Sequence, residues 1–252
     1  MRGDFRPPLW LRAGAPPDFP DASEFEPQGL VAGGGDLSPA RLLAAYGSGI
    51  FPWYDEPPIL WWSPDPRAII ERDALHVSRS MRRRLRTTSM RVTCNIALER
   101  VMEGCAGRVE GTWITTDMKR AYLNLASSGH MLSYEVWEGS ELVGGLYGVL
   151  LGGLFAAESK FHKKTDASKI ALVSAVVDLF DRGLQLFDVQ FVTDHLETMG
   201  AKEIPRLTYL ERLKDARLAR LISVGSPRIE PPPSGTAALD VLPRVRALLE
   251  IG

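Results

Sequence analysis

The stretch MLSYEVWEGSELVGGLYGVLLGGLFAAESKF, residues 131–161, decides the fold, because it contains three apolar segments separated by short turns. The segments 132–137, 142–150 and 154–158 are rich in the residues that favour strands. Glu138-Gly139-Ser140 and Gly152-Gly153 provide the turns between them. This pattern predicts a three-stranded antiparallel meander.

Working outward, helical patterns flank the meander. A long apolar helix from about residue 168 to 181 is followed by a further strand at 185–192, and this order predicts an α+β sandwich with a mainly antiparallel sheet flanked by helices. In the short segment after that strand, Asp194 and Glu197 predict a capping box. Further helices are expected after Ser38 and Ser78, near 95–103, at 117–127, at 207–221 and at 236–250, where Pro243 should interrupt the last one.

Composition changes along the chain predict three parts. Residues 1–66 are rich in proline, glycine and aromatics and predict a small N-terminal domain; its loop FPWYDEPPILWWSPDPR, residues 51–67, should pack on another domain or line a pocket. Residues 67–225 predict the larger α+β domain. Residues 226–252 contain the proline-rich SPRIEPPPSG and predict a linker and C-terminal tail.

Overall composition excludes several classes of protein. The chain has 252 residues, with 30 basic and 31 acidic side chains, so any contact with nucleic acid requires a local basic patch. Two cysteines and four scattered histidines predict neither disulfides nor a metal site. The first residues lack the apolar core of a signal peptide, and no apolar run approaches the ~18 residues of a membrane span, so we expect neither feature. We expect a cytoplasmic protein without metal or cofactor.

Two strands carry polar residues that need an explanation. In LFDVQFVTDH, residues 186–195, alternation places Phe187, Val189 and Phe191 on one face and Asp188 and Gln190 on the other. The second face could be solvated, or it could line an active site. By the same alternation, Glu158 in FAAESKF shares a face with Leu154 and Ala156, and it could instead be a strand-end residue facing water.

An arginine stripe follows Ser78. Arg79, Arg82, Arg83 and Arg86 recur at i, i+3, i+4 and i+7, on one face of the expected helix. The stripe could be an ordinary solvated face, but arginine without lysine also suits phosphate recognition. The glycine-rich GGGD at 33–36 lacks the ending of a phosphate loop and predicts a turn instead.

Several of these segments together resemble the leucyl/phenylalanyl-tRNA–protein transferases. The similarity extends from about residue 29 to 213 and is carried by FPWY…LWWSPDPR, GTWIT at 111–115, GGLYGVLLGGLFAAESKF at 144–161, and FDVQ…DH…MGAKEIPR at 187–206. The resemblance implies a small N-terminal domain beside a domain like that of the acyl-CoA N-acyltransferases, without CoA. It also implies transfer of Leu or Phe, and in some cases Met, from charged tRNA to proteins that begin with Arg or Lys, which marks them for N-end-rule degradation.

The resemblance assigns roles to individual residues. Asp188 and Gln190 are expected to be catalytic, with Gln190 accepting a hydrogen bond from the attacking amine and Asp188 orienting Gln190. Glu158 and Asp188 are expected to bind the acceptor. The expected donor side-chain pocket comprises Leu146, Phe155, Leu172, Ala175 and Phe187, although these residues taken alone would be read as core. The expected adenosine-binding residues are Trp53, Trp113 and Tyr122, and the expected tRNA-binding residues are Arg79, Arg82, Arg83 and Arg86.

Some positions depart from the family pattern. Ala157 replaces a usual glycine and Asp166 a usual asparagine, whereas Ala175 and Phe187 differ from the commoner pocket residues. The last two changes could alter the preference among Leu, Phe and Met. Two alternatives stay open. A CoA- or lipid II-dependent acyltransferase should carry a pyrophosphate-binding segment, which is not found here, and a noncatalytic tRNA-binding module would not need the polar strand residues. We expect a monomer whose partners are Leu-tRNA, Phe-tRNA and acceptor proteins.

Overall fold

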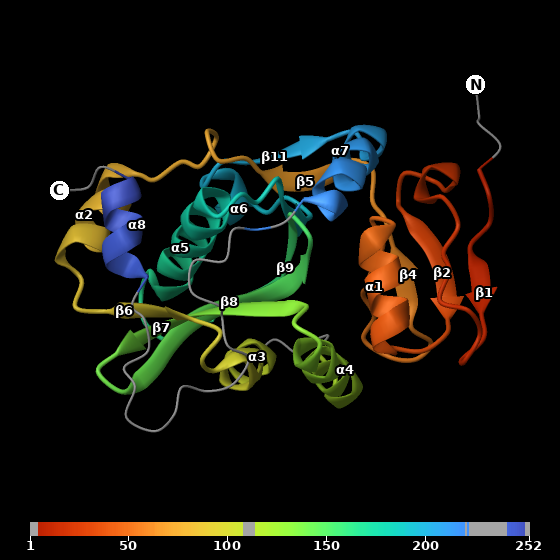
Figure 1. The fold of residues 1–252 in the computed structure, drawn as a ribbon, viewed down its shortest axis with the longest axis horizontal. Coiled ribbons are helices and arrows are strands. Elements are labelled where there is room, and N and C mark those ends of the chain that lie inside the picture. The colour runs from red at the N-terminus through yellow and green to blue at the C-terminus, as the bar shows by residue number, and fades with distance from the viewer. Residues whose placement is uncertain (1–4, 108–113, 220, 222–240, 250–252) are drawn as a thin grey trace.

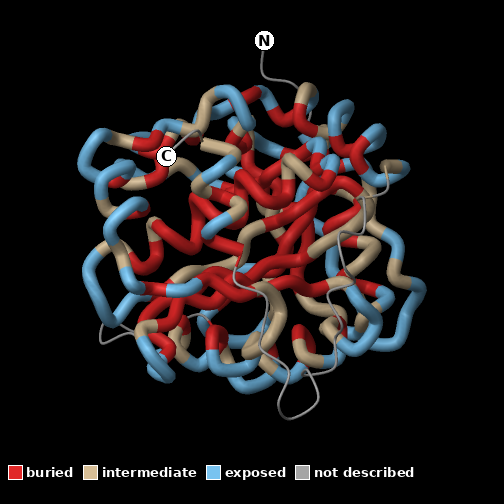
Figure 2. Tube along the Cα trace, turned by 60° about the vertical axis from the view of Figure 1, so that its left-hand side comes forward, coloured by how far each residue is buried: buried red, intermediate tan, exposed pale blue. Residues whose placement is uncertain are grey.

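The computed structural model describes residues 5–107, 114–219, 221 and 241–249, which form two sheets flanked by helices (Figure 1). One sheet has seven strands and the other four. In Figure 2 the buried trace is concentrated in the middle of the molecule, whereas the exposed trace surrounds it. Among the described residues, no helix is both long enough and apolar enough to cross a membrane.

The seven-stranded sheet contains the predicted meander. Strands β7 (Met131–Glu138), β8 (Glu141–Leu151) and β9 (Leu154–His162) are consecutive antiparallel neighbours, which confirms the prediction from residues 131–161. The full order is β11-β5-β10-β9-β8-β7-β6, and only the β9–β10 pair is parallel. The remaining strands are β5 (Arg67–Ile70), β6 (Arg91–Cys94), β10 (Leu186–Gln190) and β11 (Ala201–Ile204).

Helices cover both faces of this sheet, and two adjacent glycines in β8 let them come close. A Cβ on Gly144 would lie 2.6 Å from the Cβ of Ala167 in α5 (Ala167–Asp181), and a Cβ on Gly145 would lie 2.9 Å from Val101 in α3 (Leu98–Ala106). Neighbouring residues of a strand point to opposite faces, so the two glycines serve opposite helix layers. Helix α5 therefore packs on one face, and α3 and α4 (Thr116–Ser127) on the other (Figure 1).

The N-terminal residues form the four-stranded sheet, ordered β1-β2-β4-β3. It comprises β1 (Leu9–Leu11), β2 (Leu30–Gly34), β3 (Phe51–Pro52) and β4 (Leu60–Trp62), and a short 3-10 helix (Ala22–Glu24) precedes β2. Helix α1 (Pro39–Gly47) begins at the predicted cap, where the Ser38 side chain accepts from the Arg41 backbone. This helix contacts α4 and β8, and so joins the two sheets.

The other predicted helices are present with shifted ends. Helix α2 (Arg79–Thr87) is capped by Ser78, and α7 (Arg206–Leu218) ends earlier than expected. The predicted capping box at α6 (Asp194–Glu197) was wrong, because the cap is Thr193, whose hydroxyl accepts from the Leu196 backbone. Helix α8 (Leu242–Leu248) contains Pro243 in its first turn, where proline needs no backbone donor, so it does not interrupt the helix. The division at 1–66, 67–225 and 226–252 stays a prediction.

Candidate active site

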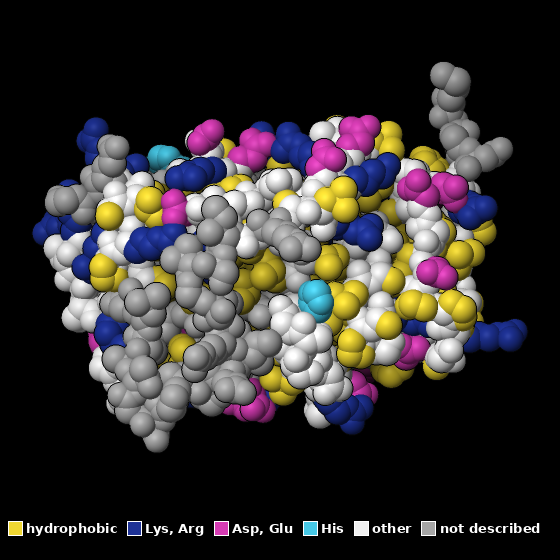
Figure 3. All heavy atoms as spheres, in the orientation of Figure 1, with side chains coloured by type: hydrophobic (Ala, Val, Ile, Leu, Met, Phe, Trp, Pro, Cys, Tyr) yellow, Lys and Arg dark blue, Asp and Glu magenta, His cyan; other side chains and the backbone are white. Residues whose placement is uncertain are grey.

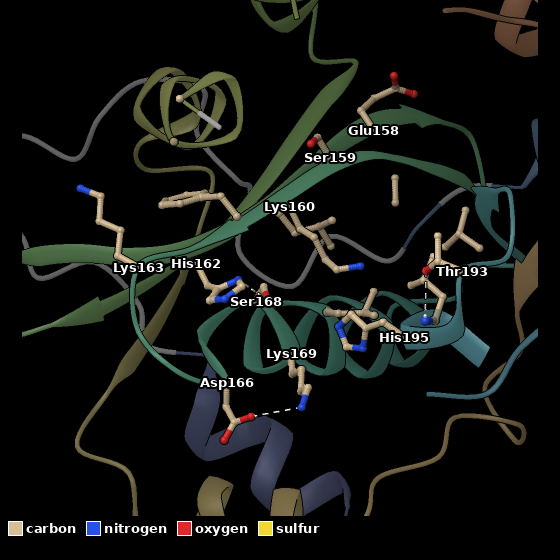
Figure 4. Close-up of a pocket in the computed structure, with 18 of the residues that line it drawn as sticks. Glu158, Ser159, Lys160, His162, Lys163, Asp166, Ser168, Lys169, Thr193 and His195 are labelled. Atoms are coloured by element: carbon tan, nitrogen blue, oxygen red, sulfur yellow. Dashed lines mark hydrogen bonds and ion pairs between the residues drawn. The ribbon is translucent and has the colours of Figure 1, made fainter. Parts of the chain in front are cut away.

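A cleft of about 1320 Å³ opens where β9 and β10 separate (Figure 4). The parallel pairing of the two strands ends at Ala156 and Asp188, so the residues that follow diverge. Glu158 and Gln190 lie beside this opening and both line the cleft. The N-terminal part of α5 forms another wall (Figure 4).

Gln190 has a left-handed backbone, with φ of 58°, at a register shift between β10 and β5. This conformation is uncommon for a residue with a side chain and costs energy. The Asp188 carboxylate accepts a 2.9 Å hydrogen bond from the Gln190 backbone N–H and so helps to hold the turn. The contact with Asp188 is therefore to the backbone of Gln190, whereas its side-chain amide donates to Glu158 at 3.4 Å.

Asp188 is completely buried and has four hydrogen-bond donors. Arg67 binds it with two parallel hydrogen bonds, Nε to Oδ1 at 2.9 Å and Nη2 to Oδ2 at 2.7 Å. The Tyr209 hydroxyl donates to Oδ2 at 2.8 Å, and the Gln190 backbone provides the fourth donor. The solvated-face alternative was wrong, because all five residues of β10 are buried.

Arg67 is itself held between two aromatic rings. Its guanidinium carbon lies 4.5 Å from the centre of the Tyr209 ring and 4.8 Å from that of Phe51. Burial acts to lower the pKa of Arg67, but the charge of Asp188 outweighs it and raises the pKa above its usual value. The Arg67 guanidinium therefore stays charged, and its two hydrogen bonds to the Asp188 carboxyl group are charge-assisted.

Glu158 occupies a bulge in β9, because Tyr147 pairs with Ser159 and the next residue of β8 pairs with Ala157. Bulges of this kind re-aim side chains near active sites. Oε2 of Glu158 accepts a hydrogen bond from the Tyr122 hydroxyl at 2.8 Å, and that hydroxyl lies 2.7 Å from the hydroxyl of Tyr46. Helices α1 and α4 thus both hold the Glu158 carboxylate.

The environment of Glu158 raises the pKa of its carboxyl group. Burial raises its pKa from 4.5 to about 7, against the lowering effect of hydrogen bonds from Tyr46 and Tyr122. The nearby charge of Asp188 raises this pKa further, whereas Arg67 lowers it. Glu158 therefore changes charge near neutral pH.

The residues predicted to form the donor pocket cluster behind this site. Leu146 and Leu172 line the cleft. Phe155, Ala175 and Phe187 are fully buried in the same apolar cluster, and the rings of Phe155 and Phe187 lie 5.1 Å apart. All five therefore belong to one buried apolar cluster, and two of them, Leu146 and Leu172, also line the cleft.

The predicted adenosine-binding residues lie in different environments. Trp53 is 44% exposed, and its ring centre lies 5.6 Å from that of Phe191 and 6.0 Å from that of Trp62. Trp113 lies outside the described residues. Tyr122 differs from the expectation, because it is completely buried and its hydroxyl binds Glu158, so its ring offers no face to a base.

Phe191 also lies where strand alternation did not place it. Val189 and Phe187 do share one buried cluster, as predicted. Phe191, however, follows the left-handed Gln190, is 39% exposed, and contacts Phe51 and Trp53.

The arginine stripe lies on the exposed face of α2. Arg79, Arg82, Arg83 and Arg86 are all exposed, whereas Met81 and Leu85 face the core. In Figure 3, Lys and Arg side chains gather near the left edge, where Figure 1 shows α2. The four arginines of the predicted face are therefore accessible on the surface of α2.

Several residues of the site were not predicted from the sequence. Arg67, Tyr209 and Tyr46 complete the polar network, and only Arg67 lay inside a quoted motif, LWWSPDPR. Lys160 and His195 also line the cleft (Figure 4), although no sequence pattern predicted a role for either residue. Within the described ranges, no cluster of three or more His, Cys, Asp or Glu side chains is arranged to hold a metal ion.

Comparisons with known proteins agree with this architecture. The family model for the leucyl/phenylalanyl-tRNA protein transferase matches residues 69–214, and the model for the N-terminal domain of that protein matches residues 35–65. Leucyl/phenylalanyl-tRNA–protein transferase from Anaeromyxobacter sp. (strain K) is 52% identical over 205 residues, 79% of this chain and 88% of its own length. The proteins of the same name from Salmonella arizonae and Escherichia coli O157:H7 are 50% and 52% identical, over 81% and 80% of this chain and 88% and 87% of their own lengths. The chain therefore belongs to the leucyl/phenylalanyl-tRNA–protein transferase family.

Proposed function

We propose that this protein transfers Leu or Phe from aminoacyl-tRNA to the α-amine of proteins that begin with Arg or Lys, and so marks them for degradation. The observation that carries the proposal is the meeting of Glu158 and Gln190 at the opening between β9 and β10, above an apolar wall. The relatives that bear the transferase name supply the reaction class. In this proposal the protein acts as a monomer in the cytoplasm, where charged tRNA is made.

The reaction requires mainly that the enzyme position the attacking amine against the tRNA ester. The tRNA ester is already activated, and an α-amine with a pKa of about 7.7 is partly neutral at pH 7. Gln190 has its amide nitrogen directed at Glu158, so its amide oxygen is left to accept a hydrogen bond from the attacking amine. Asp188 acts through the Gln190 backbone, which it holds in the left-handed turn. The two reactants are thereby held in an orientation that favours attack.

Glu158 is the better placed of the two acidic residues to bind a basic acceptor. Asp188 has no exposed surface and is already paired with Arg67. Glu158 lines the cleft, and its ionised form can accept a charge-assisted hydrogen bond from an N-terminal Arg or Lys. Such a bond contributes about 1.5–3 kcal/mol, or roughly ten- to hundredfold discrimination.

The donor tRNA would contact two separate surfaces. Leu146 and Leu172 would receive the Leu or Phe side chain, backed by Phe155, Ala175 and Phe187. The exposed Trp53 ring offers a stacking surface for the terminal adenine. The exposed arginines of α2 would bind acceptor-stem phosphates, which give affinity without reading sequence.

A transfer assay tests this proposal directly. Purified protein is mixed with labelled Leu-tRNA or Phe-tRNA and with peptides that begin with Arg, Lys or Ala, in the absence of ATP and CoA. Label should appear on the Arg and Lys peptides, and the Ala peptide is the matched control. Retained tRNA binding without transfer to any peptide would support a noncatalytic tRNA-binding module instead.

A further inference from the structure

We propose that Arg246 of the C-terminal helix α8 is a positioning residue, which sets the orientation of α2 and thereby of its arginine face toward tRNA. The inference rests on the proposed role of α2 in tRNA binding. It concerns a helix that lies beyond residue 214, where the match to the family model ends.

Arg246 binds the C-terminal end of α2. Its Nε donates to the Leu85 carbonyl at 2.6 Å and its Nη2 to the Thr88 carbonyl at 3.1 Å. The last carbonyls of a helix lack partners within the helix and carry a partial negative charge. A guanidinium at this end therefore satisfies two acceptors and interacts favourably with the helix dipole.

A second contact joins the two helices from the side of α2. Arg82 donates to the Leu249 carbonyl, just after α8, at 3.5 Å, and its Nε donates to the Val77 carbonyl at 3.2 Å. One arginine of the predicted tRNA-binding face is thus already oriented by α8. The other three, Arg79, Arg83 and Arg86, lie on the same helix and are exposed, as Arg82 is.

Helix α8 is itself anchored to the sheet domain, so it can act as a fixed support. Arg244 donates to Asp178 of α5 at 2.9 Å and also pairs with Asp181. The Val241 backbone N–H donates to the Val92 carbonyl of β6 at 2.7 Å. Leu242 and Val245 are buried in the same apolar cluster as Met81 and Leu85 of α2.

Through these contacts, Arg246 should affect the orientation of α2 and not the transfer reaction itself. Helix α2 buries only two of its side chains, Met81 and Leu85, so apolar packing alone fixes its rotation weakly. Among the described residues, the side chain of Arg246 donates to Leu85 and Thr88, and neither hydrogen bond reaches the Glu158–Gln190 network. Loosening α2 should therefore weaken the binding of a donor that carries an acceptor stem and spare a donor that lacks one.

The experiment compares two donors, Leu-tRNA and leucyl-adenosine, in Arg246→Ala, Arg246→Lys and wild-type protein. Loss of the two hydrogen bonds should raise the KM for Leu-tRNA about five- to tenfold, with kcat nearly unchanged. The KM for leucyl-adenosine should not change, and Arg246→Lys should restore part of the loss. Arg120→Ala is the matched control, because Arg120 is an exposed arginine whose ion pair among the described residues, with Asp117, lies within its own helix.

Either of two kinetic results would overturn the positioning role. Equal losses with both donors, in variants that still unfold cooperatively in urea, would make Arg246 a general structural residue. Unchanged kinetics with Leu-tRNA would show that α2 does not depend on it. The double variant Arg79→Ala with Arg83→Ala tests separately whether α2 binds tRNA, which is the part of the proposed function on which the role of Arg246 rests. If that double variant binds tRNA normally, α2 has no role in tRNA binding and the inference falls with it.

Discussion

Replacing Glu158 by Gln should make the protein more stable at alkaline pH while it reduces acceptor selection. The carboxyl of Glu158 has its pKa raised to about 7 by burial in the folded protein, compared with about 4.5 when unfolded. A raised carboxyl pKa means that the folded state binds the proton more tightly than the unfolded state does. Its contribution to stability is thus fully present below pH 4.5 and is lost as the pH rises through 7.

The size of the effect follows from the two pKa values. Between pH 5 and pH 8, wild-type protein should lose at most about 2.5 kcal/mol of unfolding free energy through this group. The Gln variant lacks the titrating group and keeps a partner for Tyr122. The difference in unfolding free energy between variant and wild type should therefore shift by about that amount in favour of the variant.

Urea unfolding at pH 5, 6, 7 and 8 measures this difference. Glu211→Gln is the matched control, because it makes the same chemical change at an exposed glutamate on α7. In parallel, wild-type transfer to Arg peptides should increase relative to Ala peptides as the pH passes 7, and Glu158→Gln should remove that increase. A Glu158→Gln difference that is independent of pH would refute the raised pKa. A uniform loss of transfer to all peptides would assign Glu158 a structural role.

Three further changes test other parts of the site. Asp188→Ala leaves Arg67 buried without its partner and should lower the unfolding free energy by about 3–5 kcal/mol in urea; transfer should fall far more than tRNA affinity, and equal losses would argue against the catalytic assignment. Arg79→Ala with Arg83→Ala should weaken tRNA binding and reduce the slope of log affinity against log salt by about two; identical binding curves at several salt concentrations would contradict it. Trp53→Ala should weaken donor binding by about 1–3 kcal/mol, measured as KM for leucyl-adenosine, if the ring stacks on adenine.

Much of the fold could be predicted because local patterns and tertiary structure agree. The segments 131–161 and 168–181 combine strong periodicity with glycine turns, and they became β7, β8, β9 and α5. The caps at Ser38 and Ser78 are local hydrogen bonds, so the sequence alone reveals them. By contrast, β5, β6 and β11 have four residues each, too few for alternation to be distinguished from a loop.

The site residues were harder to predict because they depend on contacts between distant segments. Arg67 and Asp188 are 121 positions apart, and no spacing rule joins an arginine in a proline-rich loop to a later strand. Tyr122 shows the opposite difficulty. As an aromatic residue it resembles a base-stacking platform, yet its hydroxyl points into the core and binds Glu158. Only the packing of α4 against the sheet decides between these roles.

The two irregularities in strand geometry explain why the site lies where it does. If both strands continued with regular geometry, β9 and β10 would stay paired, and no cavity would open between Glu158 and Gln190. The bulge at Glu158 and the left-handed turn at Gln190 come just after the last paired residues, and there the strands diverge. A left-handed Gln is costly, so the buried Arg67–Asp188 pair and the bond from the Gln190 backbone must hold it in place. Asp188 is buried and its carboxyl group already binds Arg67 and the Gln190 backbone. Its effect on transfer should therefore act through the position of Gln190 rather than through direct contact with either substrate.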